Sequence, residues 1–226
     1  MFIGHFGVGF AAKQALPKTS LGTLFVAAQF IDLLWPTFLL LGVERVRVEP
    51  GATAVTPLVF EYYPFSHSLI AVLGWAVLLG VAYLMMRRDR LSAVVLALLV
   101  ISHWMLDVLV HKPDLPLLPG SGTLVGLNAW SSLPITLAIE LPLFTVGVWL
   151  YSRTTMPRDA VGRWGYIGLV LFLLTLYAGN LFGTPPPSAS AIAWAGQLQW
   201  LLVLWGYWID KHRRLRPTSD DADQGA

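Results

Sequence analysis

The segment 102–114, SHWMLDVLVHKPD, places His103, Asp107 and His111 at four-residue intervals within a strongly apolar run. Residues four apart in an α-helix drift by only about 40° around its axis, so these three side chains are expected to share one face. Each step along the axis is ~6 Å, which lets His103 and Asp107 bind one metal ion or flank two close ions. His111, ~12 Å from His103, would serve only a neighbouring ion.

Four further ionisable residues lie in or beside apolar runs: His5, Asp32, His67 and Glu140. Ionisable groups inside a membrane are costly, usually face the interior of a helix bundle, and are functional candidates by default. The acids need a positive counterpart, and the apolar runs that carry them contain no Lys or Arg. We therefore expect a bound divalent ion, or protonation, to neutralise them.

The chain has no cysteine, which excludes thiolate ligands and disulfides. Imidazole and carboxylate ligands suit Zn²⁺ first, and they also suit manganese or iron. We expect one to three divalent ions. The predicted metal ligands are His5, Asp32, His67, His103 and Asp107, with His111 and Glu140 as outer candidates. Alternatively, Asp32 or Asp107 could act as the catalytic base that takes a proton from an attacking water.

Prolines follow two of these acids closely. Pro36 and Pro142 cannot donate to the carbonyl four residues earlier, so the helices are expected to kink beside Asp32 and Glu140. Freed carbonyls are tolerated in lipid only where protein or water satisfies them, which predicts a wet pocket. The competing interpretation is that each histidine is only an interhelical hydrogen-bond partner, but the clustering of histidines with acids weakens it.

The elements that must position these residues are apolar runs of membrane-spanning length. Of 226 residues, 56% are hydrophobic and 12% are charged, values typical of polytopic membrane proteins. Residues 2–12 are too short to cross a bilayer, so we expect an all-α transmembrane bundle of about six spanning helices plus a short N-terminal half-helix. One domain is expected over 1–216, followed by a disordered polar tail over 217–226. The six runs are 20–42, 67–86, 91–111, 131–151, 163–183 and 190–209.

The basic residues predict the orientation. All of the 15 Lys and Arg residues except Arg45, Arg47 and Lys112 fall on one side of the predicted spans. Because cytoplasmic loops gather positive charge, the C-terminus is expected in the cytoplasm, and the polar cluster in the outer half of an inner (cytoplasmic) membrane.

These motifs resemble the YdjM-like membrane-bound metal-dependent hydrolases, which look like relatives of the zinc-dependent phospholipases C and single-strand nucleases. The resemblance covers roughly residues 1–117, in GHFGVG around His5, AAQFIDLLWP around Asp32, YYPFSHSL around His67 and the segment with His103 and Asp107. The family's acidic pair P-D-x-D is reduced here to QFID, and its HRGxTHS becomes YYPFSHS.

The resemblance implies a membrane-embedded hydrolase acting on a phosphoester of a lipid or lipid-linked substrate from the outer-leaflet side. The expected partners are the bilayer and that substrate, and no nucleic acid. Two alternatives stay open: a proton- or cation-coupled transporter that uses the intramembrane acids and histidines, and a non-catalytic assembly protein with a structural metal.

Overall fold

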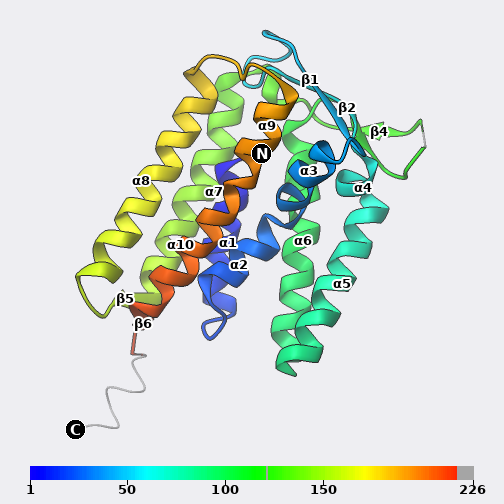
Figure 1. Cartoon of the computed structure of the whole chain (residues 1–226). Helices are drawn as coiled ribbons and strands as arrows, with labels where there is room; N and C mark the ends of the chain where they lie inside the picture. Colours follow the sequence, from blue (N-terminus) through cyan, green and yellow to red (C-terminus); the bar gives the residue numbers. More distant parts are fainter. Residues whose placement is uncertain (121, 218–226) are drawn as a thin grey trace, which may run out of the picture.

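The computed structural model describes residues 1–120 and 122–217. The tail predicted over 217–226 therefore lies, apart from Pro217, outside the described residues. Over the described part the chain is an all-α helical bundle, as predicted, with three small two-stranded antiparallel sheets at its ends (Figure 1).

The helices lie in the following order. They are α1 (Ile3–Ala15), α2 (Leu21–Ala28), α3 (Phe30–Leu40), α4 (Pro64–His67), α5 (Leu69–Arg87), α6 (Arg90–Val110), η1 (Ala129–Ser131), α7 (Leu133–Thr154), α8 (Ala160–Phe182), α9 (Ala189–Gln197) and α10 (Gln199–Lys211). The paired strands are β1 (Arg45–Val48) with β2 (Leu58–Tyr62), β3 (Leu115–Pro116) with β4 (Leu124–Val125), and β5 (Thr155–Pro157) with β6 (Arg213–Leu215).

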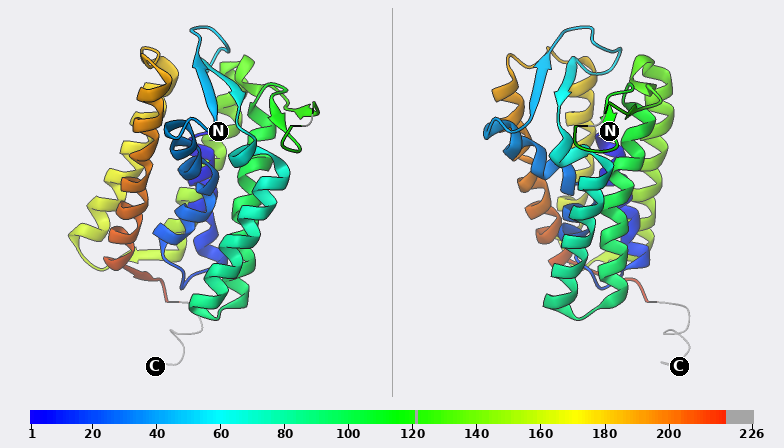
Figure 2. Two further views of the ribbon diagram at one scale, coloured as in Figure 1. Left: turned by 45° about the vertical axis from the view of Figure 1, so that its right-hand side comes forward. Right: turned by 90° about the vertical axis from the view of Figure 1, so that its right-hand side faces the viewer.

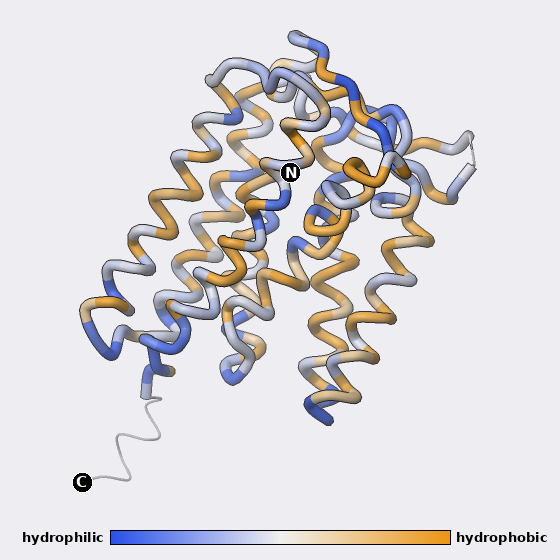
Figure 3. The backbone as a smooth tube through the Cα atoms, in the orientation of Figure 1, coloured by the Kyte–Doolittle hydropathy of each residue, from blue (hydrophilic) through white to orange (hydrophobic). Residues whose placement is uncertain are grey.

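Four helices, α5 to α8, are long and apolar enough to cross a membrane, which makes this a multi-pass membrane protein. The bent pair of α2 and α3 is a fifth candidate span. The sixth predicted run, 190–209, is instead divided at Leu198 into α9 and α10, each shorter than one crossing. Figure 3 shows the hydrophobic residues along these helices and the hydrophilic ones gathered towards the two ends of the bundle.

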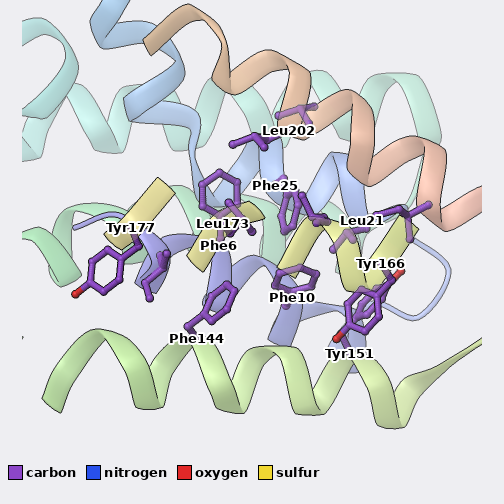
Figure 4. Close-up of a cluster of buried hydrophobic side chains, with 14 of the residues drawn as sticks. Phe6, Phe10, Leu21, Phe25, Phe144, Tyr151, Tyr166, Leu173, Tyr177 and Leu202 are labelled. Atoms are coloured by element: carbon purple, nitrogen blue, oxygen red, sulfur yellow. The ribbon is translucent and has the colours of Figure 1, made fainter. Parts of the chain in front are cut away.

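The short N-terminal helix lies inside the bundle rather than on its surface. Helix α1 packs against α7, α2 and α6, and the view turned by 90° in Figure 2 shows it among longer helices. Its close approach to α7 depends on two glycines, because a Cβ on Gly147 would lie 2.0 Å from the carbonyl oxygen of Gly7. Edge-to-face contacts of Phe10 with Phe25 and Tyr151 fill the core beside it (Figure 4).

The bend that shapes the site comes before Asp32, not at the proline after it. Helices α2 and α3 meet at Gln29 with an angle of 60°, and α3 continues through Pro36. Helix α7 likewise continues through Pro142. The sharp bend beside Asp32 is the one at Gln29, and it aims the first turn of α3, with Asp32, towards α6.

Candidate metal centre

Side chains from α3, α4 and α6 approach one another in the bundle, where Asp32, His67 and His103 form one group of possible metal ligands. Nε2 of His103 lies 3.2 Å from Oδ2 of Asp107 and 3.6 Å from Oδ1 of Asp32. Nε2 of His67 lies 3.5 Å from the same Asp32 oxygen and 3.9 Å from the same Asp107 oxygen. Tetrahedral zinc with bonds of 2.0–2.2 Å separates its ligand atoms by about 3.3–3.6 Å. The four nitrogen–oxygen distances, 3.2–3.9 Å, therefore lie around the spacing that such an ion requires.

Helix α6 and the end of α2 together orient His103. Its Nδ1 lies 2.8 Å from the carbonyl oxygen of Ala28, the last residue of α2. A carbonyl oxygen only accepts, so the hydrogen of a neutral His103 is on Nδ1, and Nε2 keeps a free lone pair. That nitrogen is fully buried and has no hydrogen-bond partner within the described residues. The donor set and this unpartnered nitrogen fit a metal ion.

The other oxygen of Asp107 faces a second set of groups on α1. Oδ1 lies 3.0 Å from Nε2 of His5 and 2.6 Å from the terminal nitrogen of Met1. His5, His103 and Asp107 form a second group of possible ligands. Both groups need the same free nitrogen of His103, and an imidazole nitrogen binds one ion at a time. Of the predicted one to three ions, the geometry therefore favours one.

Although the apolar runs that carry these acids contain no Lys or Arg, one of the acids has a positive group beside it. The terminal nitrogen of Met1 pairs with Asp107, and the start of α1 supplies two backbone N–H groups to Glu140. Oε2 of Glu140 accepts from Phe2 at 2.9 Å and from Gly4 at 3.3 Å. Glu140 belongs to neither group of possible ligands, and it stabilises the first turn of α1 instead.

His111, the residue directly after α6, is also separate from both groups. The N–H of His111 still donates to the carbonyl of Asp107 at 2.9 Å, and at a ψ of 145° the chain after it turns away from the helix. Nδ1 of His111 lies 3.0 Å from Oδ1 of Asp114, and its ring lies 4.3 Å from the ring of Trp130. The helical rise predicts that His111 lies too far from His103 to share one ion with it, and His111 is in neither group.

The centre is open on one side only. The side chain of Asp32 is 23% exposed, whereas those of His67, His103 and Asp107 are at most 3% exposed. An ion or a reacting group must therefore approach past Asp32. One contact that the sequence did not reveal is Ser66, whose Oγ lies 2.7 Å from Nδ1 of His67. Its position directly before His67 in the SHS triplet is the only signal that could have indicated it.

Comparisons with protein families, with curated proteins and with solved structures find no match to this chain. The resemblance drawn from the sequence motifs therefore stays a prediction, and the case for function depends on the geometry of the centre.

Proposed function

We propose that this chain is a membrane-embedded, metal-dependent hydrolase of the YdjM-like kind, with one divalent ion, zinc first, held by Asp32, His67, His103 and Asp107. The observation that carries the proposal is the convergence of Nε2 of both histidines with one oxygen of each acid, at 3.2–3.9 Å. When bound, a zinc ion supplies hydroxide near neutral pH and polarises the scissile group.

The residues of the chain would accept the proton and hold the ligands in position. Asp32 is the acid that solvent or substrate reaches, so it is the group placed to receive the proton of an attacking water. Asp107 is anchored through Oδ1 by His5 and by the terminal nitrogen of Met1, which holds Oδ2 towards the histidines. His103 is fixed by the carbonyl of Ala28. Buried, fully anchored ligands keep the centre in place while the exposed acid faces the reaction.

A lipidic substrate with a phosphoester bond is the class that we propose. An apolar groove of about 470 Å³ lies between α3, α4 and α5, beside the short helix that carries His67. Such a groove can accommodate an acyl chain of the proposed substrate. We further propose an inner-membrane location with the β5–β6 end, and so the C-terminus, in the cytoplasm. The groove is lined by Phe38, Val43, Phe65, Ala71, Gly74, Trp75 and Leu78.

The first experiment is metal analysis of the detergent-purified protein. We expect one zinc ion per chain in the wild type, and a loss of at least tenfold in zinc affinity in Asp107→Asn and in His103→Ala. His212→Asn is the matched control, because His212 lies beyond α10 and contacts Asp159 rather than the centre. A metal-free wild type, or loss of metal in the control alone, would contradict the proposal.

Hydrolysis is tested next with phospholipid in mixed micelles. Release of phosphate or diacylglycerol that depends on zinc and disappears in Asp32→Asn supports catalysis. Stoichiometric zinc without any turnover of phosphoester lipids would instead favour the assembly protein with a structural metal.

Ion-coupled transport is the second candidate, because one candidate span is sharply bent beside an acid. The break between α2 and α3 adjoins Asp32, and α3 packs on α9, where a Cβ on Gly196 would lie 2.5 Å from Pro36. Discontinuous helices of this kind form ion sites in many transporters. Ion flux into proteoliposomes that Asp32→Asn abolishes, with no lipid hydrolysis, would favour this function over the first.

A further inference from the structure

A buried carboxylate outside the ligand set lies behind His67. Glu44, between α3 and β1, is only 2% exposed, and no basic side chain of the described residues pairs with it. Its Oε1 accepts from the backbone N–H groups of Phe65 and Ser66, both at 2.8 Å. Its Oε2 accepts from the hydroxyl of Ser66 at 2.6 Å. A carboxylate is buried this deeply only when hydrogen bonds replace its lost hydration.

The hydrogen count along this chain of contacts determines the state of His67. The hydroxyl of Ser66 has one hydrogen, and a carboxylate can only accept, so that hydrogen points to Glu44. The oxygen of Ser66 must then accept from Nδ1 of His67, 2.7 Å away. Nδ1 therefore carries the ring hydrogen. Nε2 is left with its lone pair directed towards Asp32 and Asp107.

We propose that Glu44 is a positioning residue for the metal centre, acting through the hydroxyl of Ser66 to fix the tautomer and ring orientation of His67. The inference rests on the proposed metal function. Groups of this kind behind a ligating histidine commonly change metal affinity by 10–100-fold when they are removed. The relay also joins the segment after α3 to α4, the helix that carries His67.

Glu44 also has a purely structural role, since its two backbone contacts are at the first turn of α4. The isosteric substitution Glu44→Gln separates the two roles. The glutamine carbonyl can keep both backbone contacts, while its NH₂ group would donate to the oxygen of Ser66. Ser66 would then donate to Nδ1 of His67, and the ring hydrogen would move to Nε2. If Glu44 only stabilises the first turn of α4, the substitution should hardly change zinc affinity. If Glu44 fixes the tautomer of His67, the substitution removes the lone pair on Nε2 that faces the centre.

The test measures zinc affinity by competition with a chelating dye, in the full-length protein in detergent. We expect Glu44→Gln to weaken zinc binding by 10–100-fold. Ser66→Ala should weaken it less, because without the hydroxyl neither tautomer of His67 is imposed. The double variant Glu44→Gln/Ser66→Ala should match Ser66→Ala, because the hydroxyl that transmits the change is gone. A Glu44→Gln protein that binds zinc with wild-type affinity overturns the inference. A double variant that binds zinc no more tightly than Glu44→Gln also overturns it.

A second measurement does not depend on metal. The ¹⁵N chemical shifts of the His67 ring, in metal-free protein labelled at histidine, report which nitrogen carries the hydrogen. We expect hydrogen on Nδ1 in the wild type and on Nε2 in Glu44→Gln; hydrogen on Nε2 in the wild type overturns the relay. A wild type that binds no zinc but shows the predicted tautomers overturns the proposed function and leaves the relay supported, so the two failures are distinguishable.

Discussion

The rings of His5 and His103 are stacked, with their centroids 3.6 Å apart and their planes 7° from parallel. The contact joins α1, which is too short to cross a membrane, to the spanning helix α6. His5 also lies 3.0 Å from Asp107, so one α1 side chain contacts two proposed ligands on consecutive turns of α6. Helix α1 is therefore a support for the centre from within the bundle.

This arrangement predicts different effects for two substitutions of His5. Phenylalanine keeps a flat ring on His103 but removes the contact with Asp107, whereas alanine removes both and leaves a cavity. We expect His5→Ala to lower the free energy of unfolding by about 3 kcal/mol and His5→Phe by about 1–2 kcal/mol. Thermal unfolding in detergent measures both. Equal losses would mean that the stack contributes nothing beyond the polar contact.

Substitution of Glu140 should affect stability more than metal binding, because this acid holds the start of α1. Glu140→Ala leaves the buried N–H groups of Phe2 and Gly4 without their acceptor, which costs about 1–3 kcal/mol, while Glu140→Gln retains a carbonyl oxygen and should cost less. Unfolding and zinc titration of the same samples check this. If a folded Glu140→Gln protein lost its zinc, Glu140 would have to be counted as a metal ligand after all.

A buried ion pair joins α1 to α10 away from the centre. Lys13, which the sequence places among the cytoplasmic cations, is only 3% exposed; its Nζ lies 2.8 and 3.0 Å from the two carboxylate oxygens of Asp210. Lys13→Met should destabilise the protein by about 3–5 kcal/mol, because it leaves a buried charge unpaired. The double variant Lys13→Met/Asp210→Leu should recover part of that loss. Zinc affinity should not change in either folded variant.

The close crossing of α1 and α7 predicts that a Gly→Ala substitution there destabilises the protein, the opposite of its usual effect in a helix. Gly→Ala inside a helix normally stabilises it by up to about 1 kcal/mol. At Gly147 the added methyl would meet the backbone of Gly7, so Gly147→Ala should lower the melting temperature. Gly74→Ala is the matched control: a Cβ there meets nothing within 4 Å, and the substitution should be neutral or stabilising. Similar melting temperatures for the two variants would contradict the close approach.

One contact outside the spans predicts a dependence on pH. A hydrogen bond with His212, followed by one from the backbone of Gly162, lowers the pKa of Asp159 below its usual value. A group whose folded pKa is lowered contributes stability above its unfolded pKa, and that contribution is lost as the pH falls through the folded value. We expect His212→Ala to move the acid-unfolding midpoint to higher pH, measured by circular dichroism. A midpoint that stays the same or falls would exclude this contribution.

The sequence by itself determined the class of protein, the pairing of His103 with Asp107, and the list from which the centre is built. Hydropathy is additive along a chain, and helical spacing of four residues is local, so both can be read without knowing the fold. The same spacing sets His111 about two turns from His103, and His111 is in neither group of possible ligands.

Only the tertiary structure decided which acids face the histidines. Asp32 reaches them because the chain bends by 60° at Gln29, within what the sequence predicts as one apolar run, and Glu140 turns instead to the start of α1. Glu44 contacts Ser66, 22 residues away, from a loop that the sequence gives no reason to bury. Contacts between distant segments depend on how whole helices pack. A carboxylate that this packing buries must accept hydrogen bonds from whichever donors lie beside it, and these cannot be read from its own neighbours in the sequence.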